Sequence, residues 1–307
     1  MRFLTQGFIY CVIAAFGFSG VNICLRSLTV RCDRVWVLLI KEAITFVAIA
    51  VWARLGGRLD GRVLPGWRTI AVLTTIGALT HLLGTLPWLW SLAEVGLAVA
   101  VPLSLCTSLV TTAALGRWVL EERVSGRSLV AMGLLLGAVG VLTSGTQAPP
   151  DRLASAVAAL GSWTLWLATS AACMAGIIYG VLNIAVRHSV TRGVSLVFVA
   201  LVGPVMGVVC LGPVCAWRAA WEGFPPFSQY DLLLLAAGGM LNAVAWFAFV
   251  KSLQSIAAVH ANLVTASQVG IAALAGVCLF GEALSPAVIT GVAMTALGIV
   301  CIDPSSS

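Results

Sequence analysis

Polar side chains inside long apolar runs are the residues of this sequence whose types could do chemistry. Lys41 and Glu42 follow Val35 by six and seven residues in such a run. A charge at that depth in a bilayer costs several kcal/mol, about 3 on insertion scales, unless it faces protein or water. Adjacent helical residues point about 100° apart, so we expect one of the two to line a solute pathway and the other to face a neighbouring helix or the headgroups. Lys41 either lines the pathway or snorkels to the outer interface.

Two histidines in apolar runs, His81 and His260, could also bind a solute or change charge near neutral pH. For each, an interhelical hydrogen bond that only holds helices together is an equally open interpretation. His260, Val264 and Gln268 are spaced by four residues, so we expect them on one helix face, with Asn262 elsewhere on that helix. His81, His260 and Gln268 are therefore candidate pathway residues.

One stretch of the sequence occurs twice. "SGVNICLRSLTVR" at 19–31 resembles "GVLNIAVRHSVTR" at 180–192, and the offset (183 − 22 = 161) places Asn22 on Asn183. The same offset places Phe18, Ile23, Arg26 and Arg31 on Tyr179, Ile184, Arg187 and Arg192. Each asparagine either faces the pathway or forms an interhelical hydrogen bond in its own half. Tyr179, Asn242 and Trp246 are further candidates, because aromatic faces can contact a cation or an apolar solute.

The composition places these residues in a membrane. The 307 residues are 60% hydrophobic and 9% charged, and the mean hydropathy is +1.05, whereas soluble domains are about 25% charged. The lipid bilayer is therefore a partner of this chain. Nucleic acid is not, because the basic residues lie mostly between apolar runs, where they orient a membrane protein. The nine cysteines show no metal-binding spacing, and we expect no metal and no cofactor.

The elements that carry the candidates are apolar runs of about the 20 residues that one crossing requires. Ten spans are predicted near residues 5–25, 35–53, 69–91, 97–117, 128–144, 164–186, 194–216, 231–250, 257–280 and 286–302. The linker "SGTQAPPDR" divides the chain into residues 1–147 and 148–307. No charge occurs from Leu153 to Val186, and the beginning of that stretch, 153–162, could lie along the membrane interface.

The duplication extends beyond the first span of each half. "AALGRWVLEERVS" at 113–125 resembles "AALAGVCLFGEALS" at 272–285, which aligns Glu122 with Glu282. Each half has five spans, an odd number, so the second half enters the bilayer from the opposite face. The predicted fold class is an all-α polytopic membrane protein of about ten transmembrane helices in two inverted five-helix repeats. Five glycines after these glutamates are expected to allow close helix approach, namely Gly133, Gly137, Gly140, Gly291 and Gly298.

The distribution of arginine gives an orientation. The loop after the second span carries Arg54, Arg58, Arg62 and Arg68, whereas the equivalent loop of the second half has only Arg218. Basic loops stay on the cytoplasmic side, so we expect both termini in the cytoplasm and a location in the cell inner membrane. The loop after the first span carries three arginines and runs against the rule.

The two five-span halves, each with a fourth span that ends in "VLEERVS" or "LFGEALS", resemble the EamA-like family of the drug/metabolite transporter superfamily. The resemblance covers nearly the whole chain and implies transport of small molecules. The superfamily includes exporters of amino acids, other metabolites and toxic compounds, and carriers of sugar derivatives. The resemblance also implies a role for Lys41, which stands near a position where family members often carry a basic residue. The first half departs from the family's Gly-Glu pattern and has Glu121-Glu122.

The leading hypothesis is a secondary transporter, an exporter of small metabolites such as amino acids, that exposes a central site alternately between two inverted repeats. The alternatives are an intramembrane enzyme, a non-transporting membrane scaffold, and efflux of drug-like or toxic compounds. No catalytic residue is predicted, since the sequence has no His-Glu-x-x-His and no Gly-x-Ser-x-Gly.

The energy source and the substrate charge are partly constrained. No phosphate-binding loop occurs, so a coupling ion or the substrate's own gradient would drive transport. Glu42 is the only carboxylate near membrane depth, which favours neutral, zwitterionic or anionic metabolites over cationic drugs. A homodimer remains an open alternative.

Overall fold

Every secondary-structure element in the described part of the chain is a helix. The computed structural model describes residues 2–29, 31–55, 65–95, 97–122, 126–145, 162–271, 274 and 286–300. In chain order, the helices are α1 (Arg2–Thr29), α2 (Arg34–Leu55), α3 (Trp67–Leu79), η1 (Thr80–Thr85), α4 (Leu86–Val95), α5 (Leu97–Val119), α6 (Gly126–Gly145), α8 (Ser162–Thr191), α9 (Leu196–Glu222), α10 (Gln229–Ser252), α11 (Ala258–Thr265) and α13 (Pro286–Val300). The π-helical turn η1 joins α3 to α4 without a break.

Each predicted span coincides at least in part with one of these helices. Six helical segments of the described residues are long and apolar enough to cross a membrane: Gln6–Thr29, Arg34–Leu55, Trp67–Val95, Trp166–Thr191, Leu196–Glu222 and Gln229–Ser252. The chain is therefore an integral multi-pass membrane protein, while the number of ten crossings stays a prediction. The linker at 146–152 and most of the uncharged stretch 153–162 lie outside the described residues.

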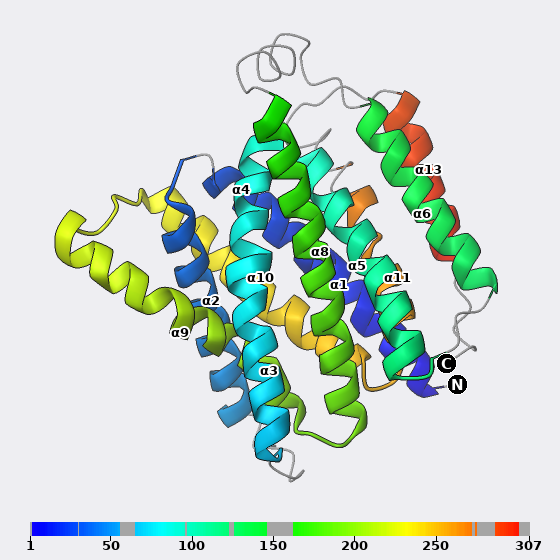
Figure 1. The fold of residues 1–307 in the computed structure, drawn as a ribbon, viewed down its shortest axis with the longest axis horizontal. Helices are drawn as coiled ribbons and strands as arrows, with labels where there is room; N and C mark the ends of the chain where they lie inside the picture. The colour runs from blue at the N-terminus through cyan, green and yellow to red at the C-terminus, as the bar shows by residue number, and fades with distance from the viewer. Residues whose placement is uncertain are drawn as a thin grey trace.

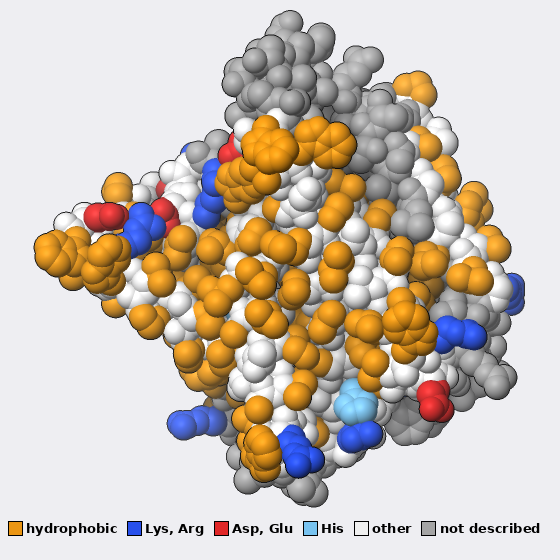
Figure 2. Space-filling model, viewed as in Figure 1, with side chains coloured by type: hydrophobic (Ala, Val, Ile, Leu, Met, Phe, Trp, Pro, Cys, Tyr) orange, Lys and Arg blue, Asp and Glu red, His pale blue; other side chains and the backbone are white. Residues whose placement is uncertain are grey.

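The surface has the distribution of side chains that a bilayer requires. Figure 2 shows hydrophobic side chains over the middle of the visible face, with charged side chains toward its margins. Several tryptophans near helix ends are strongly exposed, including Trp67, Trp118 and Trp221. Amphipathic rings in such positions are typical of the headgroup level, so this surface is suited to lipid.

Local signals set the helix ends around α9 and α10. Gly223 has a φ of +78° and ends α9, a conformation that glycine adopts without a steric penalty. Ser228 caps α10, since its hydroxyl accepts from the Asp231 backbone N–H while the Asp231 carboxylate accepts from the Ser228 backbone N–H. This reciprocal capping satisfies two backbone donors that would otherwise be unpaired at the helix start.

The helices pack as pairs that join the two halves of the chain. Helix α1 packs against α10, and α8 packs against α5 and against the segment α3–η1–α4. Helix α2 packs against α9 and α10, whereas α6 and α13 lie side by side at one edge of the bundle (Figure 1). Between α5 and α8 the backbones are so close that a Cβ on Gly176 would overlap Ser104 O, and one on Gly180 would lie 2.6 Å from Thr111 Cβ.

The five predicted packing glycines lie on this edge pair. A Cβ on Gly137 would be 2.7 Å from Met294 Cε of α13, which fits a close approach. Gly291 and Gly298 are buried on α13, and the surroundings of Gly140 lie outside what the structure describes. Gly133 gives the prediction no support, because it is exposed and no described atom lies within 4 Å of a Cβ placed there.

Candidate functional site

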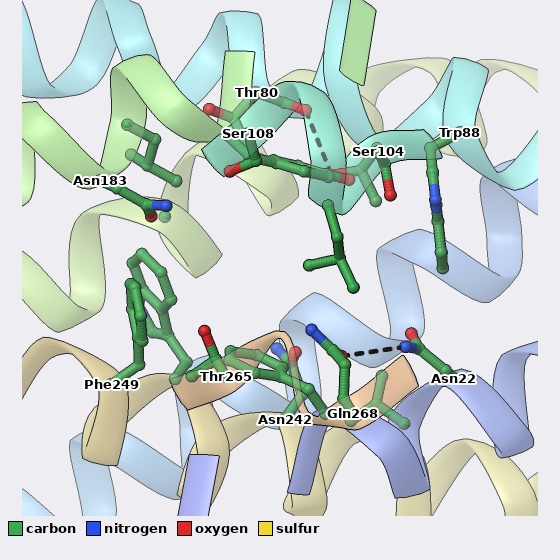
Figure 3. A pocket seen from close by; sticks show the side chains of 18 of the residues that line it. Asn22, Thr80, Trp88, Ser104, Ser108, Asn183, Asn242, Phe249, Thr265 and Gln268 are labelled. Atoms are coloured by element: carbon green, nitrogen blue, oxygen red, sulfur yellow. Dashed lines mark hydrogen bonds between the residues drawn. The ribbon is translucent and has the colours of Figure 1, made fainter. Parts of the chain in front are cut away.

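A cavity of about 220 Å³ lies in the interior between residues of the two halves. Its wall is formed by side chains from α1, α2, η1, α4, α5, α8, α9, α10 and α11, together with Gln268. In Figure 3, Thr80, Ser104 and Ser108 lie on one side of this space, with Asn22, Gln268 and Thr265 on the other. The wall therefore combines many hydrogen-bonding groups with aromatic faces.

One part of the wall is charged. Lys41 Nζ lies 2.6 Å from Glu42 Oε1, and the two residues are 6% and 4% exposed. Both line the cavity, so the expectation that only one of them would face it is wrong. The 100° between adjacent helical positions applies to the Cβ directions, whereas these long side chains bend until their charged ends meet. Pairing offsets part of the cost of burying each charge.

His81 lies next to this ion pair. Its Nε2 is 2.8 Å from the carbonyl oxygen of Gly203, and its Nδ1 is 3.9 Å from Glu42 Oε1. The imidazole is buried, and Nδ1 has no hydrogen-bond partner among the described residues. Gly207 of α9 provides the room for this arrangement, since a Cβ there would be 2.6 Å from Glu42 Cγ and 3.1 Å from His81 Cε1.

The rest of the polar wall is built from neutral amides and hydroxyls. Asn22 Nδ2 donates to Gln268 Oε1 over 3.3 Å, a bond drawn in Figure 3. Asn183 Nδ2 donates to Asn262 Oδ1 over 3.0 Å, and Asn262 Nδ2 donates to Thr112 Oγ1 over 2.7 Å. These bonds link helices that are far apart in sequence, so the amides both shape the wall and hold it together.

Aromatic and small polar residues complete the wall. Tyr179 donates its hydroxyl to Thr85 Oγ1 over 3.2 Å, and Trp246 Nε1 donates to Ala200 O over 2.9 Å. Asn242 Nδ2 donates to Thr45 Oγ1 over 3.1 Å. Hydrogen bonds thus hold the polar groups of Tyr179, Asn242 and Trp246 in place. The ring faces of Tyr179 and Trp246 are left for apolar contact.

The structure brings together most of the residues singled out in the sequence. The cavity is lined by Asn22, Lys41, Glu42, His81, Tyr179, Asn183, Asn242, Trp246 and Gln268. His260 is buried but is not among the lining residues, whereas Asn262 is. The expected face with His260, Val264 and Gln268 is not formed, because α11 ends at Thr265 and a turn at 266–267 precedes Gln268. The four-residue spacing therefore does not apply across that turn.

Several lining residues were not predicted. They are mostly hydroxyls and aromatics: Thr80, Thr85, Trp88, Ser104, Ser108, Phe249 and Thr265. Serine and threonine are common in membrane helices, so their type alone gave no signal. The duplicated sequence does carry one, because most of these residues stand at the 161-residue offset from another lining residue.

The pairing of lining residues across the two halves is extensive. Nine lining residues of the first half have their counterpart (183 − 22 = 161) on the same wall: Phe18/Tyr179, Val21/Leu182, Asn22/Asn183, Glu42/Gly203, His81/Asn242, Thr85/Trp246, Trp88/Phe249, Val101/Asn262 and Ser104/Thr265. The offset also relates two hydrogen bonds outside the cavity. Arg26 Nη1 donates to Leu92 O, and Arg187 Nη1 donates to Leu253 O. The 161-residue offset found in the sequence therefore also relates many of the residues that line the cavity.

Polar contacts join the halves at both ends of α10. Beyond its C-terminal end, Glu122 accepts from Arg187 Nε over 3.0 Å and from the backbone N–H of Ala258 over 3.1 Å. This fits the structural role expected for Glu122, while Glu282 lies outside the described residues.

At the other end of α10, Arg31 Nη2 is 3.3 Å from Asp231 Oδ1, and Arg218 Nη1 is 3.0 Å from Asp33 Oδ2. Burial and the neighbouring Asp231 carboxylate raise the pKa of the Cys32 thiol, so it stays protonated at neutral pH. Within the described residues, no group of three or more His, Cys, Asp or Glu side chains could hold a metal ion.

Comparisons with known proteins agree with this architecture. The EamA-like transporter family, part of the drug/metabolite transporter superfamily, matches residues 166–302, which confirms the resemblance over that part of the chain. A solved crystal structure superposes with a TM-score of 0.71 at 14% identity and covers 97% of this chain and 96% of its own. At that identity the likeness shows the fold alone. None of the curated proteins compared with the chain matches it.

Proposed function

We propose that this chain, an EamA-like protein by the match of residues 166–302, is a secondary transporter that exports small metabolites such as amino acids. Residues 1–147 and 148–307 form two inverted five-helix repeats, and the cavity between them is the substrate site. Alternating rotation of the repeats exposes this site first to one side of the membrane and then to the other. The single observation that carries the proposal is an interior cavity in which side chains of both halves, at equivalent positions in the sequence, combine apolar and aromatic surface with amides, hydroxyls and an ion pair.

The helix contacts support the inverted repeat. If α1, α2, α3–α4, α5 and α6 correspond to α8, α9, α10, α11 and α13, each contact should recur with the halves exchanged. The contact of α1 with α10 corresponds to that of α8 with α3–η1–α4, and the contact of α5 with α8 corresponds to that of α11 with α1. The pairs α2–α9 and α6–α13 correspond to themselves. This is the contact pattern of a two-fold axis.

The size and chemistry of the cavity favour a small polar substrate. Its volume of about 220 Å³ is below the range of about 300–1,000 Å³ of pockets that enclose drug-sized ligands. Lys41 and Glu42 present one positive and one negative group, while amides and hydroxyls offer neutral hydrogen bonds. A zwitterion can exchange partners with such a pair, its carboxylate to Lys41 and its ammonium to Glu42, with no net charge left buried.

The contacts at the two ends of α10 fit the alternating movement. Both sets join residues of the first half to residues of the second, and the length of α10, about 36 Å at 1.5 Å per residue, separates them. With the termini in the cytoplasm, Glu122–Arg187 closes the inner end, and Arg31–Asp231 with Asp33–Arg218 closes the outer end. Opening either end requires that its ion pairs separate.

Ligand-dependent stability tests the proposal. Purified protein is heated with a panel of free amino acids and other small metabolites, because a ligand present at 100 times its Kd stabilises the folded form by about 2.7 kcal/mol. We expect a zwitterionic or anionic metabolite to raise the Tm by about 5 °C or more, and the same compound to cross proteoliposome membranes in a saturable way. Gly212→Ala, remote from the cavity wall, is the matched control. A stabilising compound that the liposomes do not transport would contradict a transporter and favour a binding scaffold.

A further inference from the structure

We propose that Glu42 and His81 form a proton-binding site on the wall of the cavity, and that this proton is the coupling ion of transport. The coupling rests on the proposed function. The site itself rests on the geometry of three buried side chains, Lys41, Glu42 and His81, and can be tested without a substrate.

The hydrogen bond to Gly203 fixes which nitrogen of His81 carries hydrogen. A carbonyl oxygen only accepts, so Nε2 is the N–H donor over 2.8 Å. In the neutral ring, Nδ1 then carries a lone pair, which faces Glu42 Oε1 at 3.9 Å and has no hydrogen-bond partner among the described residues. Two acceptors facing each other in a buried site are unfavourable. A proton on Nδ1 replaces this repulsion with an attraction between an imidazolium and a carboxylate.

One carboxylate oxygen of Glu42 faces both Lys41 and His81. Lys41 Nζ is 2.6 Å from Oε1, the atom that also faces His81. Without the extra proton, Lys41 and Glu42 cancel, and the group of three is neutral. With it, the group carries one net positive charge, which attracts a carboxylate in the cavity. Proton binding and substrate binding promote each other in this way, so an exporter would carry the proton out together with the substrate.

The surroundings leave few other titratable groups to take the proton. From α8, Tyr179 lines the cavity and donates to Thr85. From α9 the pair faces the glycines 203 and 207, and α10 contributes Asn242 and Trp246. The lining residues of α1, α4 and α5 in the described chain are uncharged. Among the lining residues of the described chain, the His81 imidazole and the Glu42 carboxylate are therefore the groups that we expect to accept a proton.

The backbone is arranged around these groups. His81 lies in the π-helical turn η1, and such turns inside α-helices occur frequently at functional sites. On the facing helix, Gly207 leaves room for both side chains, because a Cβ there would lie 2.6 Å from Glu42 Cγ and 3.1 Å from His81 Cε1. The π-helical turn η1 and Gly207 of α9 thus lie on either side of His81, whose Nδ1 has no hydrogen-bond partner among the described residues.

Histidine NMR tests the site in the full chain. The protein has three histidines, so selective ¹³C and ¹⁵N histidine labelling in detergent gives three signals, and His188→Gln and His260→Gln assign His81 by elimination. We expect the His81 signals to report protonation of Nδ1 as the pH is lowered from 9 to 5. In Glu42→Gln its midpoint should fall by at least one pH unit, a tenfold or greater loss of proton affinity. His188, near the C-terminal end of α8, is the internal control and should not move.

Two results would overturn the proposal. One is a His81 signal that stays constant from pH 5 to 9; the other is a midpoint that Glu42→Gln leaves unchanged. If Glu42→Gln does not fold, Glu42→Asp withdraws the carboxylate by one methylene and should lower the midpoint by less. Titration as expected, with no transport of any stabilising metabolite, would contradict the proposed function and leave the proton site standing. Transport of equal rate at all these pH values would remove the coupling.

Discussion

The two halves contribute to one cavity in different ways. At the 161-residue offset, Lys41, Glu42 and His81 of the first half correspond to Val202, Gly203 and Asn242 of the second. The first half thus supplies the buried charges, and the second supplies a carbonyl group, an amide and the space beside Gly207. If the halves are the two repeats proposed above, duplication accounts for the shape of the wall, and the differences between the copies account for its chemistry. Burying a charge costs free energy even when it is paired, so a second buried ion pair in the other half would add a second desolvation penalty.

Removing the charges from the first half is the strongest test of this comparison. Lys41→Met or Glu42→Gln alone leaves an unpaired buried charge, for which we expect a loss of about 3–5 kcal/mol and a fall of the Tm by about 10 °C. The double variant Lys41→Met/Glu42→Gln resembles the second half and should recover most of this stability without recovering transport. Thermal unfolding and flux are measured on all three variants. A double variant as unstable as the singles would show that the two charges do not act as a pair.

The second test fills the space that the second half provides. Gly207→Ala places a Cβ 2.6 Å from Glu42 Cγ, so the side chains must shift, and we expect a loss of about 1–3 kcal/mol together with weaker metabolite binding. Gly212→Ala on the same helix is the matched control, because no described atom lies within 4 Å of its Cβ. The control should be neutral or slightly stabilising, since alanine favours the helix by about 1 kcal/mol. Equal effects of the two changes would argue against a role for the space at Gly207.

The third test compares one residue with its counterpart. Asn183 donates to Asn262, which itself donates to the buried Thr112, whereas Asn22 has a single longer bond to Gln268. Asn183→Ala leaves Asn262 Oδ1 without its donor, so we expect a loss of about 1–3 kcal/mol. Asn22→Ala should cost about 0.6 kcal/mol, the average for interhelical bonds in membranes. Thermal unfolding of both variants measures the two losses. An equal or larger loss from Asn22→Ala would contradict the greater stabilising role of Asn183.

The helices could be predicted because each crossing leaves a long apolar run between charged or glycine-rich segments. The membership of the cavity wall was predictable where a strongly polar residue interrupts such a run, as for Lys41 and Asn183. The turn at 266–267 was not, because no glycine or proline marks it in "LVTASQV". Gly207 was not either, since its importance depends on which side chains of α2 and η1 face it. The rotation of each helix about its own axis depends on the helices packed against it, so a single sequence does not predict which residues face the cavity.

The last test concerns the end of the fourth span, where the copies differ at the residue before the aligned glutamate. The first half has Glu121 before Glu122, and the second has Gly281 before Glu282. Glu121 has a φ of +56°, a left-handed conformation that costs a residue with a Cβ about 1–2 kcal/mol. It is exposed, so Glu121→Gly removes this strain with little loss of contacts, and we expect a gain of about 1 kcal/mol and a Tm higher by about 2–4 °C. Glu121→Ala, which keeps the Cβ, is the control and should give no such gain. If Glu121→Gly lowers the Tm, the glutamate side chain has a stabilising role at this end of α5 that glycine in the second copy does not supply.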